Sequence, residues 1–588
     1  MVSVLPDLPA VDRTFDYLLS PQLARGAAIG SIVRVPLAGR VVRGWIVGWD
    51  VQPPAGVRLS EIRKLTGAGP SQEMIELCRW AAWRWGSRHA IFLRMASPDR
   101  VVGSIAQRPG QERPGPQRPG PQRPGPERSG PERSGPADPL MSPRSVLRLP
   151  PVDDGFEVAL RATRHGDALI ICPSVRSATS MARRLRSAGV RTALHPDDWG
   201  RAAAGGVTVV GPRSAAFAPM PSLAAVVVVD EHDEALQAEG SPTWHAREVA
   251  LERARRARVP AVMTSAIPSL EALSRSPLQL VDRRTERLGW PAMIVIDRRD
   301  EDLGRTGLLS ERLVPLLREP GHVVCVLNTV GRARLLACGS CGTVERCERC
   351  DAAVSQIESG RLRCRRCGLE RPEVCQSCGS TTLRLLRQGV SRVAEELSAL
   401  VGEPVNEISH RTPFDQPASR VVVGTEAALH RSDRADRVIF LEFDQELLAP
   451  RYRASEQALG LLARAGRLVG GRRGSVVVQT RHPDHPVLRA AATGDPGPVT
   501  EAEDLLRREL DLPPAATLAV IGGPAGPGFL EALVLPDGCV RLEMATQSVV
   551  TTHDRPALLD ALAATPRPPG RLRLQIDPLR IPQPSPPG

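Results

Sequence analysis

The sequence predicts an α/β protein of several domains, with two parallel-sheet lobes in tandem. Three observations support this prediction. A chain of 588 residues is too long for one compact core. Short apolar runs such as ALIICPS and LAAVVVVDEHD alternate with helical stretches, a pattern typical of parallel strands that are covered on both faces. A second set of such runs follows, and a block of cysteines interrupts it.

The chain begins with two small predicted units. Residues 1–70 alternate apolar and polar residues between glycines and prolines, as in IVRVPLAGRVVRGWIVGW, which predicts a β-rich module. Residues 71–103 show helical spacing of Leu77, Trp80 and Trp85. We interpret these tryptophans as core packing of a small helical unit, with stacking on nucleic acid as the alternative.

Residues 104–143 are predicted to be a linker. They repeat pentapeptides such as RPGPQ, RPGPE and RSGPE. Proline and glycine at this density form neither helix nor sheet, and the repeat has no apolar residue to bury. Its arginines could contact phosphate, but their alternation with glutamates favours a solubilising tether.

The remainder of the chain divides into a first lobe (144–305), a second lobe (306–494) and a terminal domain (495–588). The second lobe carries the cysteine block as an insertion (336–380). The terminal domain opens on the helical stretch EAEDLLRRELDLPP and ends on the strand-like RLRLQIDP, which predicts a small α+β unit.

The chain is basic, which favours a polyanionic partner without identifying it. Lysine and arginine number 77 against 65 acidic residues, and the net charge is +12. A genome-wide preference for arginine explains the excess equally well. Lys64 is the one lysine, so every other basic group is a guanidinium, which binds phosphate in a fork rather than as a compact point charge.

The chain is predicted to be cytoplasmic. Its first residues carry Asp7 and Asp12 and lack the apolar core of a signal peptide. The longest apolar run, Leu223 to Val229, is too short to span a bilayer, so no membrane partner is expected.

Four Cys-x-x-Cys pairs predict two metal sites. Two thiolates three residues apart on a tight turn can reach one tetrahedral ion at about 2.3 Å, so four pairs suit two closed, structural zinc sites. Iron–sulfur ligation is the alternative. Spacing alone does not give the pairing. The surrounding arginines form either a solvated face or a phosphate contact.

The order of RTFDYLL, VRVPLAGR, GPRSAAFAPMPSLAAVVVVDEHD, PTWHAREVA, SAIPSLEAL, the cysteine pairs, ARAGR and QIDP resembles the PriA family of primosomal replication-restart helicases over essentially the whole chain. The resemblance implies two RecA-like lobes, an N-terminal DNA-binding domain and a winged-helix-like remnant at 71–103. It also implies binding to stalled or abandoned forks and single-stranded DNA. Single-stranded DNA-binding protein and other primosome proteins are the implied protein partners, recruited to reload the replicative helicase.

The resemblance also assigns site residues. Phe15, Asp16 and Tyr17 correspond to the pocket for the 3'-terminal nucleotide, together with Gly39 and with Arg63, where the family has lysine. An aromatic face can stack on a base, a carboxylate can accept from the 3'-hydroxyl, and a cation can hold phosphate. Without the resemblance, FDY would be interpreted as an ordinary strand.

The family's zinc pairing carries over to all eight cysteines of the block. It implies one zinc on Cys338, Cys341, Cys375 and Cys378 and a second zinc on Cys347, Cys350, Cys364 and Cys367.

The sequence departs from the family at the nucleotide site. A helicase of this kind needs a Walker A loop with glycine amides, a lysine and a Ser/Thr around the phosphates. The corresponding stretch, LRLPPVDDGF, carries Asp153 and Asp154 and no Gly-Lys-Ser/Thr. The carboxylates of these two residues lie where the phosphates of ATP would bind, so we expect no ATP cofactor.

The other motor residues are then expected to be vestigial. These are Asp230 and Glu231 after the strand VVVV, which could in principle hold magnesium and orient water, and Arg464 and Arg467 in ARAGR, which would serve as arginine fingers.

The main hypothesis is therefore a zinc-containing protein of replication restart that binds forks and 3' ends without ATP-driven unwinding. An active ATP-dependent 3'-to-5' DNA helicase with an unconventional nucleotide site is the alternative. A zinc scaffold that binds only proteins is the third possibility.

Overall fold

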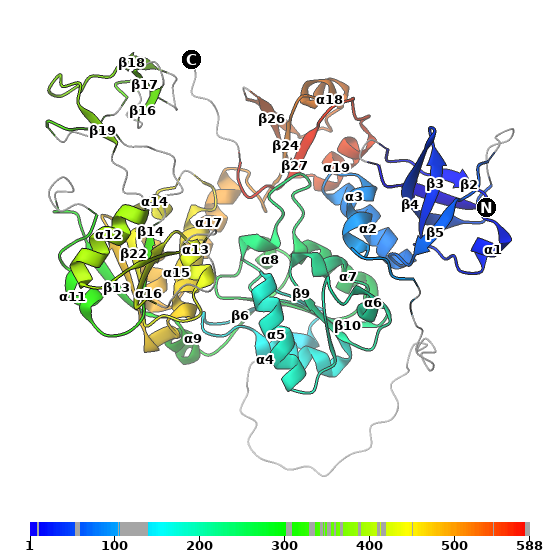
Figure 1. Cartoon of the computed structure of the whole chain (residues 1–588), viewed down its shortest axis with the longest axis horizontal. Coiled ribbons are helices and arrows are strands. Elements are labelled where there is room, and N and C mark those ends of the chain that lie inside the picture. The colour runs from blue at the N-terminus through cyan, green and yellow to red at the C-terminus, as the bar shows by residue number, and fades with distance from the viewer. Residues whose placement is uncertain are drawn as a thin grey trace, which may run out of the picture.

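The structure is a computed structural model (Figure 1). It describes the chain outside residues 9–10, 53–58, 104, 106–138, 302–307, 328–335, 342–344, 346, 350–353, 358–359, 365–368, 386–389, 409–411, 413–418, 450, 545 and 582–588. Most of the predicted linker 104–143 lies outside the described residues, as do Cys350 and Cys367.

The N-terminal region is a five-stranded antiparallel sheet in the order β2-β1-β4-β3-β5. One face of the sheet packs Val2, Val4, Val33 and Val35 into a small core, because alternate residues of a strand point to the same face. Its elements are β1 (Val2–Pro6), β2 (Phe15–Tyr17), α1 (Pro21–Ala24), β3 (Ile32–Leu37), β4 (Arg40–Trp49) and β5 (Lys64–Gly67).

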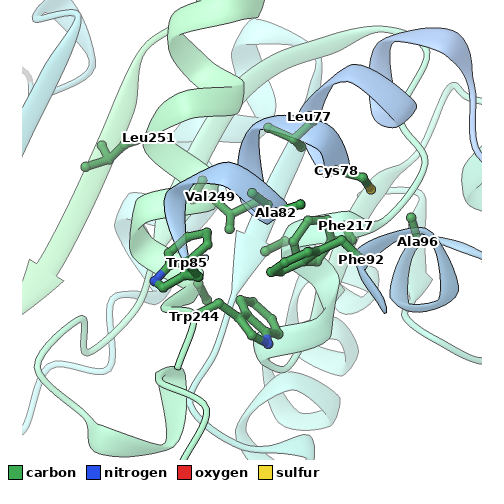
Figure 2. Close-up of a cluster of buried hydrophobic side chains, with 14 of the residues drawn as sticks. Leu77, Cys78, Ala82, Trp85, Phe92, Ala96, Phe217, Trp244, Val249 and Leu251 are labelled. Carbon is green, nitrogen blue, oxygen red and sulfur yellow. The ribbon is translucent and has the colours of Figure 1, made fainter. Parts of the chain in front are cut away.

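Two helices, α2 (Gln72–Arg84) and α3 (His89–Ala96), connect this sheet to the first lobe. Trp85 is 2% exposed, in agreement with the core-packing interpretation. Four aromatic rings form a chain of contacts from α2 into the first lobe (Figure 2). The ring centroids of Trp85 and Phe92 are 6.1 Å apart, those of Phe92 and Phe217 are 5.6 Å apart, and those of Phe217 and Trp244 are 5.1 Å apart. Such contacts bury large apolar areas, so the two helices pack against the first lobe in one hydrophobic core.

The first lobe has a seven-stranded sheet in the order β12-β6-β11-β10-β7-β9-β8, and its strand pairs are parallel. Both faces of this sheet are buried. On β7, Ala168 and Ile170 belong to the hydrophobic core on one face, and Leu169 and Ile171 belong to the core on the other face. The elements are η1 (Pro139–Met141), β6 (Arg144–Arg148), α4 (Phe156–Ala162), η2 (Thr163–His165), β7 (Asp167–Ile171), α5 (Val175–Ser187), β8 (Thr192–Leu194), α6 (Trp199–Ala203), β9 (Thr208–Gly211), η3 (Arg213–Phe217), β10 (Leu223–Val228), η4 (Glu234–Leu236), α7 (Ala246–Ala257), β11 (Ala261–Ser265), α8 (Leu270–Leu273), β12 (Leu278–Leu280) and α9 (Arg283–Gly289).

The second lobe has a six-stranded parallel sheet in the order β13-β23-β22-β14-β21-β20, again with a core on each face. Strand β13 precedes residue 305, the predicted boundary, yet it pairs with β23 and so belongs to the second lobe. The elements are β13 (Ala292–Asp297), α11 (Leu313–Arg318), β14 (Val323–Leu327), α12 (Val390–Val401), β20 (Asn406–Ile408), β21 (Val421–Gly424), α13 (Ala427–Arg431), β22 (Arg437–Glu442), α14 (Asp444–Leu447), α15 (Ala454–Leu468), η5 (Gly471–Arg473), β23 (Ser475–Thr480), α16 (Pro486–Thr493) and α17 (Gly497–Glu509). Helix α17, which was predicted to open the terminal domain at residue 495, packs against α15 and α16 and so belongs to the second lobe. The predicted α/β fold class with two parallel-sheet lobes is confirmed.

The cysteine block forms two small antiparallel sheets that stand apart from the two lobes in Figure 1. One pairs β15 (Leu336–Cys338) with β19 (Leu383–Leu385). The other is ordered β16 (Val354–Ile357), β17 (Arg361–Cys364), β18 (Glu370–Pro372).

The C-terminal sheet, in the order β25-β26-β24-β27, docks on both the first lobe and α2. Thr243 Oγ1 donates to Ile576 O at 2.7 Å, and Trp83 Nε1 donates to Asp560 Oδ1 at 2.7 Å. Its elements are β24 (Thr517–Gly522), α18 (Gly526–Ala532), β25 (Val540–Glu543), β26 (Gln547–Thr552), α19 (Arg555–Ala564) and β27 (Arg573–Ile576). No helix in the described part of the chain is long and apolar enough to cross a membrane.

Candidate functional site

The two lobes face one another across a cavity of about 180 Å³. The first lobe lines it with Pro151, from the loop after β6, and with residues 230–234, which follow β10. The second lobe lines it with α15. This is the place where the carboxyl ends of parallel strands present polar side chains, the usual position of a ligand in such folds.

Arg467 of α15 reaches across this cavity to the first lobe. Its guanidinium donates to Asp230 Oδ2 at 2.5 Å and to Asp230 Oδ1 at 2.8 Å. It also donates to the carbonyls of Pro151 at 2.6 Å and of Asp153 at 3.2 Å. Burial alone would raise the pKa of Asp230, but Arg467 lowers it. One side chain therefore joins Asp230 to the loop after β6.

Two further contacts of α15 close the same side of the cavity. Arg464 Nη2 donates to Asp233 Oδ2 at 2.6 Å. Gln457 donates to a carboxylate oxygen of Glu234. Asp230, Asp233 and Glu234 are therefore all bound by side chains of the second lobe.

Glu231 is fully buried and bound within its own lobe. Its Oε1 accepts from the Ser269 amide at 2.8 Å, and its Oε2 accepts from the Ser269 hydroxyl at 2.8 Å and from Arg247 at 2.6 Å. Both oxygens are occupied, so Glu231 is held as a structural anchor between β10 and α8. Arg247 and Ser269 lie in PTWHAREVA and SAIPSLEAL, which carried the family resemblance, but nothing in the sequence assigned them to this anchor.

In the loop before α4, backbone amides bind carboxylates of the same loop. The Gly155 amide donates to Asp153 Oδ1 at 2.9 Å, and the Phe156 amide donates to Asp154 Oδ1 at 3.2 Å. Asp154 also pairs with Arg184. Gly155 has a φ of +74°, so a side chain there would be strained. The amides of the N-cap residue and of the first residue of α4 are thus bound by the loop itself.

A second interlobe network, which the sequence did not reveal, lies beside the cavity. Arg453 of the second lobe pairs with Glu271 of the first. Arg507 of α17 lies 3.5 Å from Glu271 and 2.6 Å from Glu456 of α15. Burial alone would raise the pKa of Glu271, but Arg453 and Arg507 lower it to about 2. These buried charges connect the two lobes directly.

The residues predicted to form a 3'-end pocket lie on β2, on the β3–β4 turn and just before β5; β2 and β5 are the two edge strands, and a bridge between Leu18 and Glu61 connects these edges. Phe15, Asp16 and Tyr17 make up β2, while Arg63 is exposed and its amide donates to Arg34 O of β3 at 2.9 Å. Gly39 occupies the β3–β4 turn with a φ of +75°, and a Cβ there would contact nothing. The turn therefore needs glycine for its backbone conformation rather than for space.

The residues of β2 that were predicted to form the pocket point to two different faces of the sheet. Asp16 is paired with Ser3, whereas Phe15 and Tyr17 pair with Val4 and Val2 and join their core on the opposite face. Tyr17 is 3% exposed, and its hydroxyl donates to Pro36 O at 3.0 Å. The ring of Phe15 is half-buried beneath the Arg13 guanidinium, 4.8 Å from the ring centroid.

The cysteine block brings four thiols together in the geometry of a metal site. The sulfurs of Cys338, Cys341, Cys375 and Cys378 all lie within 4.8 Å of one another. Cys338 Sγ is 3.5 Å from Cys378 Sγ, and Cys341 Sγ is 3.6 Å from Cys375 Sγ. Four thiolates around zinc, at about 2.3 Å each, lie about 3.8 Å apart. The four sulfurs therefore fit a tetrahedral ion.

The groups around this site shift the pKa values of its thiols in different directions. Hydrogen bonds from the backbone amides of Cys341 and Ser340 lower the pKa of Cys338 to about 6. Glu345 raises the pKa of Cys375 to about 12 and is itself held by Arg371 at 2.5 Å. A divalent cation overrides such a rise, because it deprotonates the thiols that coordinate it. The second predicted set lies only partly within the described residues.

Residues 3–98 match the 3'DNA-binding domain (3'BD) family of PriA proteins, which covers both the N-terminal sheet and α2–α3. The probable replication restart protein PriA of Mycobacterium tuberculosis (strain CDC 1551 / Oshkosh) is 30% identical over 587 residues, covering 90% of this chain and 88% of the relative. The chain belongs to the PriA family of replication restart proteins. This confirms the family predicted from the sequence.

Other PriA relatives match over shorter stretches. Replication restart protein PriA of Bacillus subtilis (strain 168) is 28% identical over 397 residues, covering 60% of this chain. The chain spans 49% of the length of that relative. Among solved structures, the E. coli DExH-box NTPase HrpB aligns with a TM-score of 0.33 and 14% identity over 60% of this chain and 41% of that one. S. cerevisiae Dbp5 L327V bound to RNA and ADP BeF3 aligns with a TM-score of 0.36 and 11% identity over 63% of this chain and 91% of that one.

Proposed function

We propose that this PriA family member binds forked DNA and 3' ends and recruits restart partners without ATP-driven unwinding. Single-stranded DNA-binding protein and other primosome proteins are the proposed partners. In this proposal the two lobes serve as a rigid support, and the N-terminal 3'DNA-binding domain makes the contact that defines the function.

The contact between Arg467, Asp230 and the carbonyls of Pro151 and Asp153 carries the proposal. In a motor, a lysine and amides of the phosphate loop bind the terminal phosphates, and the carboxylate after the strand binds magnesium. Here the guanidinium neutralises that carboxylate, and the loop offers carbonyl oxygens and two aspartates. The phosphates of a nucleoside triphosphate would therefore meet the two aspartates of the loop where they need a lysine and backbone amides.

Titration of magnesium–ATP into the full chain, followed by calorimetry and by phosphate release with and without forked DNA, tests this proposal. We expect neither binding heat nor turnover. Unwinding of a fork that depends on ATP and disappears on Asp230→Ala would refute the proposal and establish the alternative, an ATP-dependent 3'-to-5' helicase.

For the 3'-end pocket, we propose that Phe15 stacks on the terminal base, that Asp16 accepts from the 3'-hydroxyl, and that Arg63 and the turn at Gly39 hold the adjacent phosphate. Tyr17 then has a positioning role, since its hydroxyl ties β2 to the strand that leads to Gly39. Asp16→Ala is expected to abolish any preference for a free 3'-hydroxyl over a blocked end, measured by equilibrium binding to matched forks. Equal preference in the variant and the wild type would contradict the assignment of Asp16.

For the cysteine block, we propose structural zinc on Cys338, Cys341, Cys375 and Cys378, and a second zinc on Cys347, Cys350, Cys364 and Cys367. Metal analysis of the purified chain is expected to give two zinc ions, and Cys375→Ser one. Cys539→Ser is the matched control, because this cysteine lies outside the block, and it should leave the zinc content unchanged. Iron with visible absorbance would instead establish the iron–sulfur alternative.

A further inference from the structure

Three basic residues lie side by side across the N-terminal sheet. Arg34 of β3 is the direct partner of Arg43 on β4 and of Lys64 on β5. Directly paired residues of antiparallel strands point to the same face, with Cβ atoms about 4.5–5.5 Å apart. Arg43, Arg34 and Lys64 therefore form a basic row that crosses three strands.

The basic row is poorly neutralised by the protein. Within the described residues, the side chains of Arg34 and Lys64 are exposed and make no ion pair or hydrogen bond. Arg43 has Asp7 at 4.0 Å, but Asp7 is bound more closely by Arg94, at 2.5 Å. Like charges directly opposite one another destabilise a sheet. An anion that bridged them would remove this repulsion.

The row cannot turn away from solvent, because the other face of β3 is committed to the core. Val33 and Val35, which flank Arg34, are both fully buried. The row is also joined to the proposed 3'-end pocket, since the Arg63 amide donates to Arg34 O at 2.9 Å. Arg63, one member of the proposed pocket, therefore adjoins the row.

We propose that the basic row binds the sugar–phosphate backbone of the DNA strand that enters the 3'-end pocket. The charge of the row supports this ligand, because guanidinium and ammonium groups bind phosphate, and a DNA strand offers a continuous series of phosphates. The contact rests on the proposed DNA-binding function and adds to it a sequence-independent, salt-sensitive component. An acidic protein surface is the competing occupant, and the experiment distinguishes it.

The test is the salt dependence of DNA binding by the full chain. For the double variant R34A/K64A, we expect the slope of log K against log salt to become shallower by about 1.4 to 1.8, from two lost phosphate contacts. Its affinity loss between 50 and 200 mM salt is then about tenfold smaller than that of the wild type. The control R472A/R473A removes the same charge from an exposed turn of the second lobe and should leave the slope unchanged.

The outcomes separate this inference from the proposed function. R34A/K64A should weaken binding equally to forks with free and blocked 3' ends, and R34K/K64R should restore the wild-type slope. An unchanged slope in R34A/K64A, with DNA binding intact, overturns the basic row as a phosphate site and leaves an acidic protein as its occupant. Failure of the wild-type chain to bind any fork overturns the proposed function and this inference together.

Discussion

The interlobe cavity and the N-terminal sheet use the same residue type in opposite ways. Arg464 and Arg467 each bind a carboxylate of the opposite lobe, at 2.6 and 2.5 Å. Arg34 and its neighbour Lys64 are exposed on the N-terminal sheet without a carboxylate partner among the described residues. The net charge of +12 therefore does not describe where a polyanion can bind, because the pairing of each cation decides that. Arg464 and Arg467 thus serve cohesion between the lobes, whereas Arg34 and Lys64 of the N-terminal sheet are available for a ligand.

The largest effect is expected from removing a cation that is both buried and paired. Arg247→Met leaves Glu231 as an uncompensated buried charge, which costs about 3–5 kcal/mol in the free energy of unfolding of the first lobe. Denaturant unfolding followed by tryptophan fluorescence measures it, since Trp244 lies in this lobe. The double variant E231L/R247M should recover much of the loss. Equal stability of Arg247→Met and the wild type would contradict the anchor role.

The pH dependence of stability tests the second interlobe network. The pKa of Glu271 is about 2 in the folded protein and about 4.3 in an unfolded chain, so its ion pairs stabilise the fold fully above about pH 5. This contribution, of about 3 kcal/mol, disappears as the pH falls from 5 towards 2. Glu271→Gln should therefore be much less stable than the wild type at pH 7, less stable by about half as much at pH 3, and nearly equal to it at about pH 2 and below. A constant difference between the two proteins across this range would show that Glu271 is not held ionised by Arg453 and Arg507.

A smaller effect is expected at the cavity itself, where the cation is partly exposed. Arg467→Ala leaves Asp230 without its main partner and costs about 1–3 kcal/mol of interlobe stability. The variant should not acquire ATP binding, because the loop before α4 still offers no phosphate-binding lysine. Thermal unfolding and ATP titration are measured on the same sample. Tight ATP binding by Arg467→Ala would mean that the arginine masks a working site rather than replacing one.

The arrangement of the lobes could be predicted from the sequence because it depends on local patterns. Apolar runs such as ALIICPS and LAAVVVVDEHD became β7 and β10, and their alternation with helices indicated parallel sheets. The position of β13 could not be predicted, since its pairing with β23 joins segments about 180 residues apart along the chain. Local pattern identifies a strand, but not the sheet that it joins.

The same distinction applies to the candidate sites. Asp230, Arg464 and Arg467 could be selected from motifs, but their mutual contacts depend on the packing of α15 against the first lobe. Arg247 and Glu271 lie in stretches that carry the family resemblance, but the sequence assigned no role to them or to Arg453, because each gains its importance from a partner distant in sequence. The basic row was similarly hidden, since Arg34, Arg43 and Lys64 become neighbours only through the register of three strands.

The smallest effect on stability is expected from Arg34→Ala. A small effect would distinguish this exposed arginine from the paired arginines between the lobes. The side chain is exposed and opposes two like charges, so its removal should change the free energy of unfolding by less than about 0.5 kcal/mol, in the stabilising direction. Arg472→Ala, an exposed arginine of the second lobe without a like-charged strand neighbour, serves as the control and should show no gain. Both are measured by thermal unfolding at low salt, where repulsion between exposed charges is least screened. A clear loss of stability in Arg34→Ala would show that Arg34 has a structural partner, and the division between cohesive and ligand-binding arginines would no longer hold at this position.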